Sequence, residues 1–233
     1  FNRNMSEVGS TDLPADRQQE VSHRYYLGLY SLLERLVTDF PDVLFESCSG
    51  GGGRFDCGML YYMPQTWTSD NSDAIERLPI QHGTSLVYPL SSMSAHVSAS
   101  PNHQTGHVTP FDTRFNVAFT GSFGYELDPT ALSEEEQSLV RRTAEFYKKY
   151  SHVAANGRYF RLRSCYEGDC AAWEYISDDD SICIAEYVLT HVRVYPHYER
   201  LKLKGLDPDA RYRDDSGNQY TGSELMGYGI PVD

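Results

Sequence analysis

Residues 43–70 read VLFESCSGGGGRFDCGMLYYMPQTWTSD, and they contain the same pattern twice. Val43-Leu44-Phe45 predicts a short buried strand, and a glycine-rich polar run comes directly after it. Thr66-Trp67-Thr68 predicts a second strand, and an acidic motif comes after that one. Short buried strands that carry polar motifs at their carboxyl ends are typical of a parallel sheet whose strands are connected by helices. The stretch therefore predicts an α/β fold.

Helices are expected on both sides of this stretch. Between residues 16 and 37, apolar side chains recur every three or four positions, which indicates one face of an amphipathic helix. A second helix is predicted to begin near Asp73, and a capping box predicts a third over residues 133–150. Leu86-Val87-Tyr88 and Val117-Ala118-Phe119 predict two more strands of the α/β part.

The pattern changes after the third helix. Residues 173–176 and 181–189 predict two strands that flank an acidic turn, and residues 201–204 alternate apolar and charged side chains with a period of two. This pattern is typical of antiparallel β structure. We therefore predict two domains, an α/β part over residues 1–157 and an antiparallel β part over residues 158–233.

The charge balance excludes one class of partner. The chain has 33 acidic and 20 basic side chains, a net charge of −13, so it lacks the basic surface of a nucleic-acid-binding protein. No apolar run approaches the roughly 18 residues of a membrane span, so we expect no membrane association.

The ends and the cysteines bear on localisation. The opening FNRNMSEVGS has neither the charged nor the apolar region of a signal peptide, and it lacks an initial Met, so we expect an internal fragment. Five cysteines are an odd number and too few for a disulfide scaffold. This composition predicts a reducing compartment, and we expect the protein to be cytoplasmic.

Asp70 is a candidate general acid/base. It comes after a predicted strand, close to Trp67 and among small hydrogen-bonding residues, and the chemistry of parallel α/β barrels lies at the carboxyl ends of the strands. The alternative is that Asp70, Asn71 and Asp73 only cap the next helix. Spacing alone leaves both interpretations open.

The run from Cys48 to Gly53 is a candidate ligand-binding loop, because glycines let a ligand approach the backbone closely. It is not a phosphate-binding loop, since Arg54 stands where such a loop requires Lys followed by Ser or Thr. A nucleophilic role for Cys48 or Ser49 lacks the G-x-S-x-G elbow. A flexible loop without a ligand is the alternative.

Of two further groups, the histidine pair is interpreted as structural or as loosely lining a site, and the cysteine pair as structural. His103 and His107 have the spacing of a helical zinc site, but the proline, asparagine and glycine around them predict a loop. Cys165 and Cys170 belong to no complete set of metal ligands. No metal site is therefore predicted.

Long segments of the chain resemble the α-galactosidases of glycoside hydrolase family 36. Three of them are FNRNMSEVGS, VLFESCSGGGGRFDCGMLYYMPQTWTSDNSDAIERL and IQHGTSLVYPLSSMSAHVSASPNHQTGH, which lie within residues 1–107. GSFGYELD and YTGSELMGYGIP, nearer the C-terminus, also look like parts of that family. Motifs of this length and order are specific.

The resemblance implies a fold and an activity. Residues 1–157 would form the C-terminal half of a (β/α)8 TIM barrel, and residues 158–233 a small antiparallel all-β domain, an incomplete β-sandwich. The activity would be hydrolysis, with retention, of terminal α-galactosyl groups in oligosaccharides such as melibiose, raffinose and stachyose. Two carboxylates and no cofactor would carry it out. Homo-oligomerisation of the full-length protein stays open.

The resemblance also assigns residues. The family's nucleophile is the Asp of a Lys-Trp-Asp-Met-Asn-Arg-type motif, and residues 1–5 match the positions directly after that Asp, so the nucleophile is expected just upstream. Asp70 matches the acid/base, about seventy residues later, a length of two βα units that places both carboxylates on one barrel rim. The residues that match sugar-binding positions are Asn2, Cys48, Ser49, Gly50, Gly51 and Trp67.

Two other functions are kept beside the hydrolase. One is a galactosyltransferase of the raffinose- or stachyose-synthase kind, in which a sugar replaces water as the acceptor. The other is a carbohydrate-binding remnant without catalysis, because the nucleophile is expected outside the chain. For the same reason we expect the chain alone to be inactive.

Overall fold

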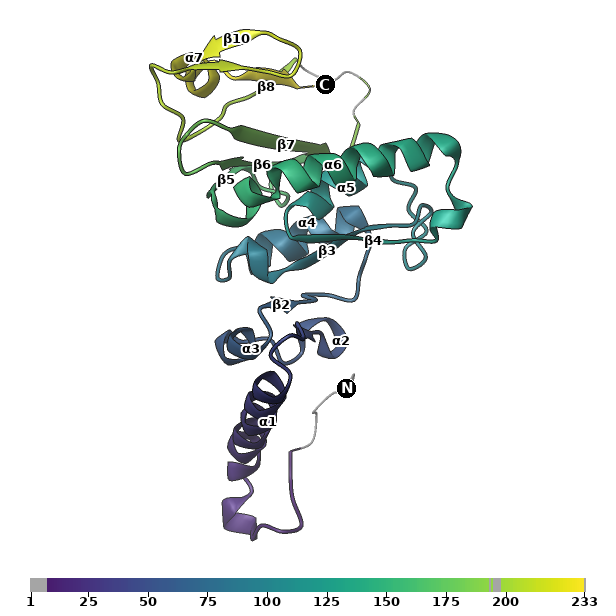
Figure 1. Cartoon of the computed structure of the whole chain (residues 1–233), viewed down its shortest axis with the longest axis vertical. Helices are drawn as coiled ribbons and strands as arrows, with labels where there is room; N and C mark the ends of the chain where they lie inside the picture. The colour runs from purple at the N-terminus through teal and green to yellow at the C-terminus, as the bar shows by residue number, and fades with distance from the viewer. Residues whose placement is uncertain (1–7, 193, 195–197, 233) are drawn as a thin grey trace. The chain divides into compact units, whose positions relative to one another are not determined.

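The computed structural model describes residues 8–192, 194 and 198–232 (Figure 1). The chain divides into two compact units. One comprises the residues up to Asn71 together with Ser92–Ser94, and the other comprises Ser72–Ser91 and the residues from Ala95 onward. None of the helices formed by the described residues is both long and apolar enough to cross a membrane.

The first unit joins one long helix to a pair of short parallel strands. The strands β1 and β2 pair through Glu46 with Gln65 and through Ser47 with Thr66, and an isolated parallel bridge joins Thr66 to Met93. The elements in chain order are the 3-10 helix η1 (Ala15–Arg17), α1 (Glu20–Asp39), β1 (Glu46–Ser47), α2 (Ser49–Gly52), α3 (Cys57–Tyr62) and β2 (Gln65–Thr66).

The second unit begins with helices and a two-stranded sheet. The sheet pairs β3 with β4, and the last residue of η2 and the first residue of β3 belong to the first unit. The elements in chain order are α4 (Ala74–Thr84), η2 (Leu90–Ser92), β3 (Ser94–Ser98), α5 (Phe111–Phe119), β4 (Ser122–Glu126), η3 (Pro129–Ala131) and α6 (Glu134–Asn156). The predicted capping box is confirmed, because Ser133 accepts a hydrogen bond from the Glu136 amide and the Glu136 carboxylate accepts one from the Ser133 amide. This reciprocal pair sets the start of α6.

The rest of the second unit is mainly antiparallel. The predicted hairpin is confirmed, and it forms part of a three-stranded sheet, β5–β6–β7. Two further pairs, β8 with β11 and β9 with β10, are also antiparallel. The bounds are β5 (Arg158–Arg163), β6 (Cys170–Ile176), β7 (Cys183–Leu189), β8 (Glu199–Leu201), β9 (Arg211–Arg213), β10 (Gln219–Thr221), α7 (Gly222–Gly227) and β11 (Ile230–Val232). The helix α7 is an addition to the all-β structure that was expected for these residues.

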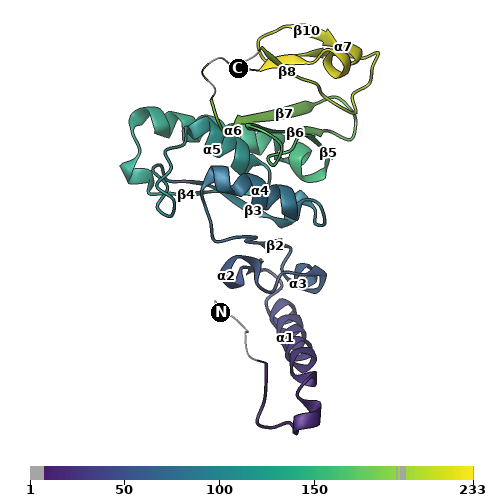
Figure 2. The same ribbon diagram turned by 180° about the vertical axis from the view of Figure 1, so that it is seen from behind.

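Both faces of the β5–β6–β7 sheet are covered. Figures 1 and 2 show the helices α5 and α6 on one face and the C-terminal strands with α7 on the other. On the helical side, Tyr175 is fully buried, packs against Phe119 and donates a hydrogen bond to Thr120. On the opposite side, buried apolar side chains form one cluster: Ala172, Ile176, Leu201, Leu203, Leu206 and Leu225.

Three of the predicted strands were wrong. Residues 43–45 precede β1, because the backbone pairing with β2 starts at Glu46. They are also not a buried segment, since Leu44 is 74% exposed. Residues 86–88 form turns that close on the carbonyl groups of Gly83 and Thr84 at the end of α4. A short apolar run does not by itself specify a strand.

Val117-Ala118-Phe119 is the end of helix α5 and not a strand. Phe115 and Phe119 lie one turn apart and both pack against Phe146 of α6, so the helix period explains their burial. Strand β3 was missed because only Ala95 and Val97 of its sequence, SAHVS, are apolar, although four of its five residues are buried.

Candidate active site

The glycine-rich loop forms a left-handed helical turn, α2. The φ angles are +60° at Ser49, +66° at Gly50, +75° at Gly51 and +89° at Gly52. The amide of Gly52 donates to the Cys48 carbonyl at 2.7 Å, which closes the turn. This conformation destabilises a residue that has a side chain by roughly 1–2 kcal/mol. The left-handed backbone therefore explains why glycines stand here, and it means that Ser49 is strained.

The turn lies against the segment after β2. A Cβ atom at Gly51 would stand 2.7 Å from the Asp70 amide nitrogen, and one at Gly52 would stand 3.2 Å from the Trp67 carbonyl oxygen. Glycine is therefore required at Gly51 for a second reason, the close approach of two backbones. This approach brings the loop and the acidic motif together.

Cys48 and Asp70 are in contact although they are 22 residues apart. The Cys48 thiol donates to Asp70 Oδ1 at a Sγ–Oδ1 distance of 3.6 Å. Cys48 and Trp67 are half-buried, whereas Asp70 is exposed. An exposed carboxyl group beside a loop of bare backbone can exchange a proton with a ligand that the loop holds.

The structure thus gathers most of the predicted site residues in the first unit. Cys48, Ser49, Gly50 and Gly51 form the turn and the residue before it, and Trp67 and Asp70 belong to the segment beside it. Asn2 and the match to the nucleophile motif lie outside the described residues.

Asp73 takes the capping role that the acidic motif also suggested. Its buried carboxylate accepts hydrogen bonds from the Ile75 and Glu76 amides at the start of α4. Burial alone would raise the pKa of Asp73, but the hydrogen bonds from Thr105 and these two amides, together with the nearby His107, lower it below its ordinary value. Asp73, and not Asp70, is therefore the N-cap of α4, and its role is structural.

The two loop histidines belong to no cluster of metal-binding side chains within the described residues. Among the residues that the structure describes, no three metal-binding side chains gather. His107 contacts Asp73, with 2.9 Å between Nδ1 and Oδ2, and it belongs to the predicted loop. The sequence contained no signal for this contact, because the partners are far apart in the chain.

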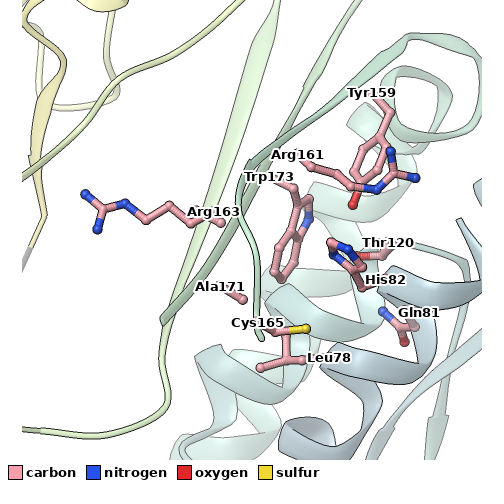
Figure 3. Close-up of a pocket in the computed structure, with 11 residues that line it drawn as sticks. Leu78, Gln81, His82, Thr120, Tyr159, Arg161, Arg163, Cys165, Ala171 and Trp173 are labelled. Atoms are coloured by element: carbon pink, nitrogen blue, oxygen red, sulfur yellow. The ribbon is translucent and has the colours of Figure 1, made fainter. Parts of the chain in front are cut away.

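A cavity in the second unit is a separate feature (Figure 3). It has a volume of about 20 Å³, which is room for a water molecule and not for a sugar. Trp173, His82 and Cys165 line it, while Figure 3 shows the Arg163 side chain directed away from them. Burial, with the charge of Arg161, lowers the pKa of His82. The cavity is too small to be the active site.

Two residues next to the turn, Arg54 and Tyr25, were not predicted from the sequence. Arg54 Nε donates to the Tyr25 hydroxyl at 2.9 Å, and Arg54 Nη1 donates to the Ser49 hydroxyl. The only available signal was the position of Arg54 directly after four glycines. Nothing in the helical pattern distinguished Tyr25 from the other residues on its face.

Comparisons with known proteins give a consistent result. Residues 1–157 match the family model described as Melibiase, and residues 170–233 match the Glycosyl hydrolase family 36 C-terminal domain. The chain is 51% identical over 232 residues to the α-galactosidase AgaA of Geobacillus stearothermophilus, and 49% identical over 231 residues to the α-galactosidase Mel36A of Lactobacillus acidophilus. It covers 32% and 31% of these proteins, about a third of their length.

Solved structures agree. The crystal structure of AgaA matches with a TM-score of 0.96 at 50% identity, over 100% of this chain and 32% of that one. A variant of AgaA in complex with raffinose matches with a TM-score of 0.95 at 50% identity, over the same shares of the two chains.

Proposed function

The chain belongs to the melibiase family of glycosyl hydrolases, and from this premise we propose that it supplies the acid/base half of a retaining α-galactosidase. The observation that carries the proposal is the contact between Cys48 and Asp70 beside the left-handed turn. This contact brings the exposed carboxyl group of Asp70 next to a turn made mostly of glycines, whose backbone is not covered by side chains. The relatives are named as α-galactosidases, which supports the same activity here.

In the proposed mechanism, Asp70 acts twice. As an acid it gives its proton to the glycosidic oxygen while a second carboxylate, expected upstream, forms a bond to the anomeric carbon and the leaving sugar departs. As a base it then takes a proton from water, whose oxygen attacks the same carbon and releases galactose with the α configuration. The galactosyl group would lie on the turn at Cys48, Ser49, Gly50 and Gly51, with Trp67 beside it.

The architecture is proposed with the function. We place residues 1–157 in the C-terminal half of a TIM barrel and residues 158–233 in a C-terminal β domain. The parallel pairing of β1 with β2 and the parallel bridge to Met93 support the first assignment, and the antiparallel sheets support the second.

All five cysteines are free thiols, which supports a reducing compartment such as the cytoplasm.

The substrates are proposed to be α-galactosyl oligosaccharides. Structures of AgaA variants with raffinose and with stachyose support this class.

The test replaces the matching third of AgaA with this chain and compares the joined protein with the chain alone. We expect the joined protein to release p-nitrophenol from p-nitrophenyl α-galactoside and to hydrolyse raffinose, and the chain alone to do neither. The anomer formed first, observed by NMR, should be α.

Other outcomes decide against the proposal. Transfer of galactose to sucrose in preference to water would support the galactosyltransferase. Binding of galactosides without turnover by a folded joined protein would support the carbohydrate-binding remnant. Turnover by the chain alone would contradict the position of the nucleophile.

A further inference from the structure

We propose that Arg54, held by Tyr25 of helix α1, positions the sugar-binding turn through the side chain of Ser49. The proposal rests on the proposed function and adds a positioning residue to it. Arg54 is assigned no contact with the substrate.

Ser49 occupies a strained position. It is the only residue of the turn that has a side chain and a positive φ angle. A glycine would adopt this conformation without the steric cost, so a serine persists here only if its surroundings hold it. What a serine offers and a glycine lacks is a hydroxyl group.

That hydroxyl is bound by Arg54. Arg54 Nη1 donates to the Ser49 hydroxyl, and Arg54 Nε donates to the Tyr25 hydroxyl at 2.9 Å. A guanidinium group is planar and presents several donors in fixed directions, so one Arg can bridge two acceptors without losing much further freedom. Ser49 is thereby connected to helix α1, which is about five turns long and lies outside the loop.

Helix α1 makes a second contact, with the start of α3. The Tyr30 hydroxyl donates to the Asp56 carboxylate at 2.9 Å, and the same carboxylate caps α3 through the Met59 amide. Burial, followed by the bond to Asp56, raises the pKa of Tyr30 to about 12. Tyr25 therefore reaches the turn through Arg54, whereas Tyr30 fixes the start of α3.

The restraint by Arg54 should affect binding of the galactosyl group more than the chemical step. Arg54 restrains the turn that would hold the sugar, whereas Asp70 belongs to the segment after β2 and accepts a hydrogen bond from Cys48. Loss of the restraint should weaken binding of the galactosyl group and leave proton transfer by Asp70 nearly intact.

The experiment uses the joined protein and three substitutions. Arg54→Met should raise KM for p-nitrophenyl α-galactoside about tenfold while kcat changes less than about threefold. A rise in KM at nearly constant kcat indicates the loss of binding that is equal in the ground state and in the transition state. Tyr25→Phe, which removes one hydroxyl group, should change KM in the same direction by a smaller factor. Ser49→Gly combined with Arg54→Met should bring KM back to within about threefold of Ser49→Gly alone, because glycine needs no restraint.

The matched control is Tyr30→Phe, the same chemical change on the same helix. It should lower the melting temperature and leave KM unchanged. A folded Arg54→Met protein with unchanged KM, or with reduced kcat and unchanged KM, would overturn the proposal, and so would a double variant that Ser49→Gly fails to restore. If Arg54→Met does not fold, Tyr25→Phe decides by the same criteria. Failure of the proposed function is separate, because the unsubstituted joined protein would then be inactive.

Discussion

At the scale of single residues, Asp70 carries the proposed chemistry. Asp70→Asn in the joined protein should slow hydrolysis of raffinose by about 10²–10⁴-fold, the usual contribution of general acid catalysis. The loss should be much smaller for aryl galactosides, because an activated phenolate leaves without a proton. Measuring kcat/KM for both substrates tests this, and azide should restore turnover with an α-configured product. An equal loss on both substrates would contradict the role of Asp70 as the acid.

Gly51 and Gly50 provide a second test at this scale. Both have positive φ angles, but a Cβ at Gly51 would collide with the Asp70 backbone, whereas nothing lies within 4 Å of one at Gly50. Gly50→Ala should therefore cost only about 1 kcal/mol of stability. Gly51→Ala should in addition displace Asp70 or the turn and lower kcat at least tenfold more than Gly50→Ala, which should act mainly on KM through the sugar that the turn would hold. Equal effects on kcat would show that the approach of the two backbones does not matter for the chemical step.

At the scale of elements, strand β7 contains a buried carboxyl group. Glu186 is 5% exposed and pairs in register with Trp173, on the face of the sheet that Tyr175 presents to the helices. Burial raises the pKa of Glu186 from 4.5 to about 8. The folded protein therefore keeps a proton that the unfolded chain releases, and stability falls as the pH rises from 4.5 to about 8.

The prediction is that Glu186→Gln removes part of this decline. Each unit of raised pKa corresponds to about 1.4 kcal/mol, so the variant should gain stability relative to the unsubstituted protein between about pH 5 and pH 9. Urea unfolding at several pH values measures the difference. The exposed Glu145→Gln on α6 is the control and should leave the pH dependence unchanged. A parallel pH profile for Glu186→Gln would mean that this carboxyl group is ionised in the folded state.

At the scale of the whole molecule, the proposed mechanism needs only two carboxylates. Dialysis of the joined protein against a chelator should therefore leave raffinose hydrolysis within about twofold of the untreated protein, since proton transfer and covalent catalysis need no Lewis acid. The added-back cations magnesium, calcium and zinc serve as controls and should not increase the rate. Loss of activity that one cation restores would require a metal step in the mechanism.

Local features were predictable from the sequence. The amphipathic pattern predicted α1, the Ser133–Glu136 box predicted the start of α6, and two apolar segments around an acidic turn predicted the β6–β7 hairpin. Each of these signals lies within a few residues of the structure it specifies. The residue pattern made Asp70 a candidate acid/base and the run after Cys48 a candidate binding loop. The resemblance to a family favoured these interpretations over the alternatives, and both roles stay predictions.

The arrangement of the site required tertiary structure. Cys48 meets Asp70 across 22 residues, and Arg54 meets Tyr25 across 29, so no local pattern encodes either contact. The left-handed turn was visible only as a run of glycines, which permits that conformation without specifying it. The end of α5 was predicted as a strand because three consecutive apolar residues fit a strand and a buried helix equally well, and the packing of Phe115 and Phe119 on Phe146 decides for the helix. The burial of Ser94 and Ser98 in β3 likewise has no signal in the sequence SAHVS.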